Sequence, residues 1–211
     1  MTTGSADLRF LTLDPAHFHA ALVHKEMVPG IAPLIHVYAP LTNDLLAHLQ
    51  HLVRFNTRSA NPTRWHVTVH AGEDYLERLL DDRRGDVVVL AGRNARKLAY
   101  LERAVAAGLH VLADKPWILT PDDLPRLEAV LSAAEQRGLV AYDIMTERYE
   151  ITSILQRRLV QDRAVFGDPL PGTPEQPGVV MESMHYLRSW SPASPCGGPG
   201  GSSTSASRAR A

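Results

Sequence analysis

Short apolar runs of strand length alternate with longer amphipathic segments of helix length from Leu8 to about Asp162. This alternation is typical of a parallel sheet with helices on both faces, because parallel neighbours need a long crossover connection. The run Val87–Leu90 contains no polar residue, as expected for a strand that is buried on both faces. The sequence therefore predicts an α/β fold with a doubly wound parallel sheet.

Six segments have the composition of strands. They are Leu8–Leu13, Ile35–Ala39, Trp65–His70, Asp86–Ala91, His110–Ala113 and Leu139–Asp143. Helices are predicted at Ala16–Met27, at Leu45–Val53, around Leu98–Val105 and at Pro121–Arg137. Thr120 is the expected N-cap of the last helix, and Gly138 ends it.

The last part of the chain differs in composition from the rest. Residues 191–211 hold no aliphatic side chain larger than alanine, so we expect a disordered, low-complexity tail. Residues 163–190 are predicted to be only the start of a second, α+β domain, with one strand-like segment at Val179–Leu187. We expect a flexible N-terminus at residues 1–7, a Rossmann-like nucleotide-binding domain at residues 8–162, and truncation after that domain.

The charge of the chain indicates no macromolecular partner. Its 211 residues carry a net charge of -1 and only short pairs of basic residues, which argues against nucleic-acid binding. The single cysteine excludes an internal disulfide framework, and the N-terminus lacks the apolar core of a secretory signal. No apolar run approaches the ~20 residues that span a bilayer. We therefore expect a cytoplasmic protein that does not enter the membrane.

A carboxylate and a lysine follow the predicted strand at His110–Ala113. In open α/β sheets, ligands bind beyond the carboxyl ends of the strands, so Asp114 and Lys115 are expected to face a ligand. The alternative is a surface ion pair between the two side chains, which contributes less than ~1 kcal/mol.

The turn after the first strand, Asp14-Pro15-Ala16-His17-Phe18-His19, lies where a dinucleotide-binding fold carries its glycine-rich loop. It contains no glycine, although the following helix could still direct free N–H groups at an anion. The pair of histidines also resembles the zinc-binding His-x-His of metal-dependent amidohydrolases. That interpretation needs further ligands from a barrel of about 250 residues, so we expect no metal and treat Asp14, Pro15, His17, Phe18 and His19 as cofactor contacts.

Other candidate cofactor contacts follow from position alone. Ala91, Gly92 and Asn94 end the strand Asp86–Ala91, and Gly92 would allow close approach of the backbone. Tyr38 ends the second strand, where an acidic residue normally binds the adenosine ribose. No acidic residue occurs there before Asp44, which leaves the choice between NAD and NADP open.

Three segments together carry a family resemblance: LTLDPAHFHAALVHKEM, GLHVLADKPW and AYDIMTERYEIT, in this order and spacing. They resemble the Gfo/Idh/MocA family of oxidoreductases, and in particular a branch with an Asp-Pro-x-His-Phe-His turn in place of the glycine-rich loop. The family's Glu-Lys-Pro signature ends its fifth strand, and Asp114-Lys115-Pro116 matches it with aspartate for glutamate. The resemblance covers about residues 8 to 188.

The resemblance implies NAD or NADP as cofactor and hydride transfer between the nicotinamide and a sugar-like or polyol-like substrate. Lys115 would be the catalytic residue, and Asp114, Lys115 and Pro116 would line the cofactor site. The Lys115–Pro116 peptide bond would be cis. The family's Asp-x-x-x-His acid–base pair has no counterpart in the remnant of the second domain, and the oligomer contact of full-length relatives would be missing with that domain.

Two classes of function remain open from the sequence. The first is an NAD(P)-dependent oxidoreductase, or its cofactor-binding half, acting on a small molecule. The second is a non-catalytic nucleotide-binding or interaction module. A metal-dependent hydrolase that uses His17 and His19 is a third alternative.

Overall fold

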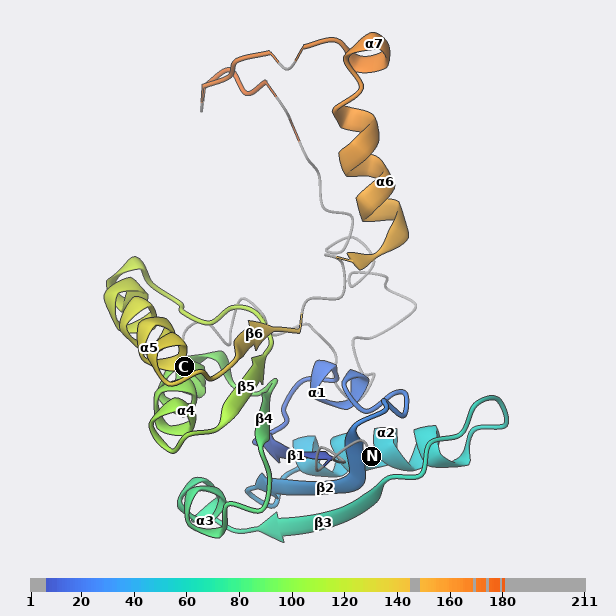
Figure 1. Cartoon of the computed structure of the whole chain (residues 1–211), viewed down its shortest axis with the longest axis vertical. Helices are drawn as coiled ribbons and strands as arrows, with labels where there is room; N and C mark the ends of the chain where they lie inside the picture. The colour runs from blue at the N-terminus through green and yellow to red at the C-terminus, as the bar shows by residue number, and fades with distance from the viewer. Residues whose placement is uncertain (1–6, 145–148, 169, 174, 179, 181–211) are drawn as a thin grey trace, which may run out of the picture. The chain divides into compact units, whose positions relative to one another are not determined.

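A computed structural model of the chain describes residues 7–144, 149–168, 170–173, 175–178 and 180. Six strands form one sheet in the order β3-β2-β1-β4-β5-β6, and all neighbours are parallel (Figure 1). The strands are β1 (Leu8–Leu13), β2 (Ile31–Ala39), β3 (His66–Ala71), β4 (Val87–Leu90), β5 (His110–Ala113) and β6 (Ala141–Asp143). This is the doubly wound order in which the topology switches between β1 and β4. The predicted fold class is confirmed.

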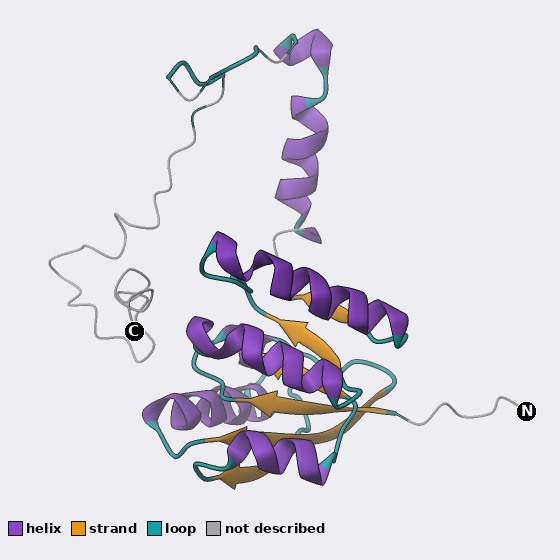
Figure 2. Cartoon of the chain, turned by 90° about the vertical axis from the view of Figure 1, so that its left-hand side faces the viewer, coloured by secondary structure: helices purple, strands orange, loops and turns teal. Residues whose placement is uncertain are grey.

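Helices cover both faces of this sheet. On one face, α3 (Tyr75–Asp82), α4 (Asn94–Ala106) and α5 (Leu124–Gln136) enclose a core with strand residues that include Val88 (Figure 2). On the other face, α1 (His19–Leu22) and α2 (Asn43–Thr57) pack on a second core that includes Val89. Consecutive residues of β4 thus enter opposite cores, which explains why its sequence has no polar alternation.

The prediction of a helix at Ala16–Met27 is wrong in extent, since only His19–Leu22 is α-helical. The N–H groups of Ala16 and His17 donate to the carbonyl of Ala91 at 3.1 and 2.8 Å, which ties the start of this segment to the end of β4. A helix of four residues remains. The helix predicted at Pro121–Arg137 begins instead with a 3-10 turn at Pro121–Asp123, followed by α5.

The described residues up to Ile144, which include the sheet, form one compact unit, and the described residues from 149 to 180 belong to a second unit. Its described elements are α6 (Ile151–Val160) and α7 (Arg163–Phe166). The carboxylate of Glu150 caps α6 by accepting a 2.9 Å hydrogen bond from the N–H of Ser153. The predicted tail at residues 191–211 and, apart from residue 180, the strand-like segment at residues 179–187 lie outside the described residues. Among the described helices, none combines the length and the apolar character that a membrane span requires.

Candidate functional site

The carboxyl ends of β1, β4 and β5 lie side by side and bring together residues that are far apart in sequence (Figure 1). Leu13 pairs with Leu90, and Leu90 pairs with Ala113. The residues that follow these partners, Asp14, Ala91 and Asp114, therefore leave the sheet next to one another. Most of the predicted site residues lie here.

Asp14 turns its side chain into the protein. The residue is 4% exposed, adopts a left-handed backbone with φ 44°, and accepts a 3.0 Å hydrogen bond from the hydroxyl of Tyr100 on α4. The hydroxyls of Tyr75 and Tyr100 lie 2.5 Å apart, and Arg96 donates to Tyr75 at 3.0 Å. Burial, followed by the hydrogen bond with Tyr75, raises the pKa of Tyr100. Asp14 thus anchors the turn to α4 rather than presenting its carboxylate to a ligand.

Gly92 lies against the same turn. A Cβ atom at this position would overlap the carbonyl oxygen of Asp14, so only glycine fits without movement of the backbone. The amides of Ala16 and His17 are occupied by the carbonyl of Ala91, as described above. They are therefore not free to bind phosphate in the way that the amides of a glycine-rich loop do.

Three aromatic rings follow in the turn, at His17, Phe18 and His19. The centroids of the His17 and His19 rings are 4.3 Å apart, and Phe18 is 49% exposed. His19 Nδ1 lies 2.9 Å from Asp114 Oδ1, and His17 Nδ1 lies 3.4 Å from Asp114 Oδ2. Burial lowers the pKa of His17 to about 4, with a further lowering by His19 that outweighs the effect of Asp114. His17 is therefore a neutral imidazole near pH 7.

Asp114 and Lys115 have opposite environments. Asp114 is 4% exposed, and its Oδ1 accepts a 2.8 Å hydrogen bond from the N–H of Lys115 as well as contacting His19. Lys115 is exposed, and its peptide bond to Pro116 is cis, as the resemblance implied. The two side chains therefore do not form a surface pair, and the lysine is the member available to a ligand.

A second lysine, Lys97 on α4, holds the main chain of this segment. Its Nζ donates to the carbonyl oxygens of Asp114 at 2.8 Å and Lys115 at 3.2 Å, and to Asn94 Oδ1 at 3.0 Å. Lys97 is 2% exposed, and burial lowers its pKa to about 8 although Asp114 opposes the shift. Asn94, predicted to contact the cofactor, thus receives a hydrogen bond from within the protein.

We expect the substitution Lys97→Met to lower the free energy of unfolding by about 2 kcal/mol. Methionine fills the space but leaves the carbonyls of Asp114 and Lys115 without their donor. Relief of the buried charge offsets part of that loss. Urea unfolding at pH 7 measures the effect, with Lys25→Met on the exposed surface as control. Equal stability of the two variants would contradict this account.

The family model described as "Oxidoreductase family, NAD-binding Rossmann fold" (GFO_IDH_MocA) matches residues 33–143, which is more than half of the chain. The chain belongs to this family. The match begins after the β1–α1 turn, so it does not include the segment at residues 14–19. NAD(P) is accordingly the cofactor class of the family to which the chain belongs.

Solved structures support the same assignment. A candidate oxidoreductase from Parabacteroides merdae is 43% identical over 84% of this chain, with a TM-score of 0.77. This chain covers 40% of the length of that protein. A candidate oxidoreductase from Thermotoga maritima (18% identity, TM-score 0.55) matches 75% of this chain and 44% of its own length, and shares the fold. A 3-ketoreductase from Actinomadura kijaniata, solved with NADP, also shares the fold, with 21% identity and a TM-score of 0.50. The match covers 77% of this chain and 45% of that protein. No curated protein matched.

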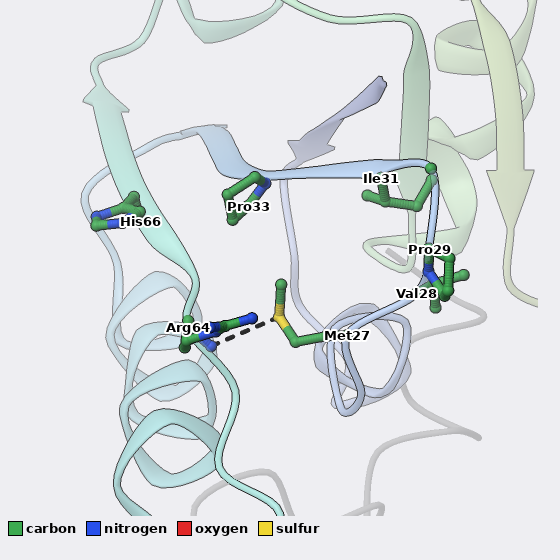
Figure 3. A pocket seen from close by; sticks show the side chains of 8 residues that line it. Met27, Val28, Pro29, Ile31, Pro33, Arg64 and His66 are labelled. Carbon is green, nitrogen blue, oxygen red and sulfur yellow. Dashed lines mark hydrogen bonds between the residues drawn. The ribbon is translucent and has the colours of Figure 1, made fainter. Parts of the chain in front are cut away.

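Two further features bear on the predicted contacts. The main chain of Tyr38 lies beside the turn, since its carbonyl accepts a 2.9 Å hydrogen bond from the N–H of Asp14. Its side chain is buried and its hydroxyl donates to Asp82 Oδ2 at 3.1 Å, so the side chain is not presented to a ligand. A hollow of about 530 Å³ lies at the amino ends of β2 and β3 (Figure 3). Its lining includes Met27, Ile31, Pro33, Arg64 and His66. Since ligands in this fold bind at the carboxyl ends, the hollow is not the predicted site.

Sequence reasoning missed Lys97 and Arg93. Lys97 shares the buried face of α4 with Tyr100, Leu101 and Ala104, at spacings of three, four and seven residues. A lysine at a position of the apolar face of a helix is a signal, visible in the sequence, that its amine is buried and bonded to a partner within the protein. Arg93 follows β4, and its Nη2 lies 3.4 Å from Asp44 Oδ2 at the start of α2. No local sequence pattern indicates that pair.

Proposed function

We propose that the chain is the cofactor-binding part of an NAD(P)-dependent oxidoreductase. Its reaction would be hydride transfer between the nicotinamide and a sugar-like or polyol-like alcohol. Family membership supports the cofactor. The observation that carries the catalytic assignment is the exposed Lys115, the second residue after β5, on a main chain held by Asp114 and Lys97. The substrate class follows from the family resemblance alone.

The residues at the strand ends fit a bound dinucleotide in two places. Lys115 offers an exposed cation beside the partly exposed rings of His17 and Phe18, which suits the nicotinamide and its ribose. Arg93 and Asp44 lie near the ends of β4 and β2, where this fold binds the adenosine ribose. The pyrophosphate between them needs donors other than the Ala16 and His17 amides, which are already paired.

The bound cofactor supplies the hydride acceptor or donor. In the oxidising direction the substrate hydroxyl would also pass its proton to a general base, which by the family resemblance belongs to the second domain, and negative charge would develop on that oxygen. The Lys115 ammonium would donate a hydrogen bond to this oxygen and stabilise the charge, which is the role that requires its exposure. Asp114 and Lys97 are positioning residues, since they fix the main chain from which Lys115 projects.

The proposal is tested by titrating NADH and NADPH against the purified chain, followed by turnover assays with sugars and polyols. We expect binding of at least one nucleotide, weakened about tenfold in Lys115→Ala because one charge-assisted hydrogen bond is lost. Lys25→Ala, another exposed lysine of the same unit, is the matched control. Absence of binding to either nucleotide would overturn the proposal.

A second prediction concerns the choice between NAD and NADP. The Asp44 carboxylate neutralises Arg93, and its charge repels a ribose 2′-phosphate. Asp44→Asn should therefore raise the affinity for NADPH relative to NADH about tenfold, by freeing Arg93 for the phosphate. The control is Asp81→Asn, which removes an exposed carboxylate elsewhere on the domain. An unchanged NADPH/NADH ratio would show that this pair lies outside the adenosine site.

A non-catalytic nucleotide-binding module is the second candidate. The observation that favours it is that both carboxylates at the strand ends, Asp14 and Asp114, are buried and hydrogen-bonded, so that neither is placed at the surface as a general base. Nucleotide binding without turnover on any sugar or polyol would favour the module over the enzyme.

A further inference from the structure

Three potential metal ligands converge at the strand ends. His17 and His19 come from the turn after β1, and Asp114 follows β5, 95 residues after His19. Their ligand atoms all lie within 4.8 Å of one another. We infer that His17, His19 and Asp114 form a binding site for a divalent transition metal ion of the zinc class.

The distances between the ligand atoms suit one shared ion. His19 Nδ1 lies 2.9 Å from Asp114 Oδ1, and His17 Nδ1 lies 3.4 Å from Asp114 Oδ2. Nitrogen and oxygen ligands lie about 2.0–2.2 Å from zinc, so neighbouring ligands of a tetrahedral ion are about 3.3 Å apart. Two of the three separations are thus close to that value, and the third lies within 4.8 Å, so a shared ion requires the imidazoles to rotate toward one another.

The hydrogen bonding around His17 also favours a cation. His17 Nδ1 accepts the N–H of His19 at 3.4 Å, and in that tautomer it carries no proton. That nitrogen has a single lone pair, so an ion would replace this long contact with the His19 N–H. His17 Nδ1 and Asp114 Oδ2, which lie 3.4 Å apart, would then be two facing acceptors, and a cation between them turns their repulsion into attraction. The ion also gives a reason for histidines at both positions of this turn.

The surroundings leave a coordination position open. The side chains of His17 and His19 are 34% and 20% exposed, whereas the side chain of Asp114 is 5% exposed and its Oδ1 accepts a hydrogen bond from the Lys115 amide. Three protein ligands, a supported carboxylate and one accessible side are typical of reactive rather than structural zinc sites. The chemical class that fits the open position is an alcohol or carbonyl oxygen. That role rests on the proposed function, whereas metal binding does not.

Neighbouring lysines set a limit on the affinity. Lys97 and Lys115 bring positive charge close to Asp114, and this charge repels the metal ion. The Lys97 ammonium is directed at main-chain carbonyls, and the Lys115 side chain is exposed to solvent. Solvent and main-chain carbonyls therefore weaken, without removing, the repulsion between these two ammonium groups and the ion. We expect the site to bind the ion with micromolar rather than nanomolar affinity.

The test measures Co²⁺ and Zn²⁺ binding in the absence of nucleotide, in a Cys196→Ser background that removes the single thiol. Calorimetry with Zn²⁺ and the visible absorption of bound Co²⁺ report stoichiometry and geometry. We expect one ion per chain and a loss of affinity of about 100-fold in His17→Ala, His19→Ala and Asp114→Asn. The control is His66→Ala, an exposed histidine at the amino end of β3.

Stoichiometric binding that is lost in the ligand variants and kept in His66→Ala supports the site. If Asp114→Asn does not fold, His17→Ala still tests the site. The His17 side chain is the most exposed of the three ligands, so its removal disturbs the fold least. Absence of stoichiometric binding, or equal loss in His66→Ala, overturns the inference and leaves the cluster as hydrogen bonds between Asp114 and the imidazoles. Because no nucleotide is present, this outcome is independent of NAD(P) binding.

Discussion

The substitution Gly92→Ala is expected to lower the free energy of unfolding by about 3 kcal/mol, and to reduce nucleotide affinity with it. The added methyl group would overlap the carbonyl oxygen of Asp14. Neither partner can yield easily, because Asp14 is held by Tyr100 and the next residues are held by the carbonyl of Ala91. The turn that carries His17 and His19 must therefore move away from β4.

The matched control for this steric effect is Gly72→Ala. A Cβ at Gly72 would meet the side-chain Oδ1 of Asp74 at 2.6 Å, and that side chain can rotate away. Urea unfolding of both variants measures the difference. If Gly92→Ala is as stable as Gly72→Ala, the close packing between the β1 turn and the end of β4 is not what holds the site together.

The sheet was the most predictable part of this molecule, and β4 shows why. Its residues Val88 and Val89 enter different cores, so the local sequence must be apolar at every position. The helix α5 could be located because Gly138, with φ 67°, provides the left-handed residue that ends it. In each case the signal is carried by adjacent residues and does not depend on distant partners.

The turn after β1 was harder to predict for the opposite reason. Its conformation depends on the carbonyl of Ala91, which accepts hydrogen bonds from the N–H groups of Ala16 and His17. Ala91 follows β4 and lies more than 70 positions later in the sequence. Without that partner, the apolar spacing of the segment favours a continuous helix. The separation in sequence between His19 and Asp114, which are in contact, is larger still. The cluster of His17, His19 and Asp114 could therefore be predicted only from the order of the strands in the sheet.

Acidification is expected to destabilise the protein through two buried histidines, His24 and His48. His24 is fully buried and His48 is 4% exposed. Among the described residues, His24 Nδ1 and both ring nitrogens of His48 have no hydrogen-bond partner. Burial, and then the charge of His48, lower the pKa of His24 to about 3, and burial followed by His51 lowers that of His48 to about 4.

The sign of the effect follows from proton binding. The unfolded chain binds these protons near pH 6.5, whereas the folded protein binds them only near pH 3–4. Their contribution to stability is therefore complete above pH 6.5 and is lost as the pH falls towards 4. Between pH 7.5 and 5 the two groups should lower the free energy of unfolding by about 2 kcal/mol each.

The variant His48→Leu isolates this effect from the other histidines with lowered pKa values, which are His17, His36 and His70. Leucine cannot take up a proton, so the fall in stability between pH 7.5 and 5 should shrink by about 2 kcal/mol. His66→Leu, at an exposed position, should retain the full fall. An equal pH dependence in both variants would mean that His48 is hydrated or paired in solution. Because His24 also contacts Thr12 of β1 at 3.2 Å, protonation of this pair would loosen the strand that leads into the nucleotide site.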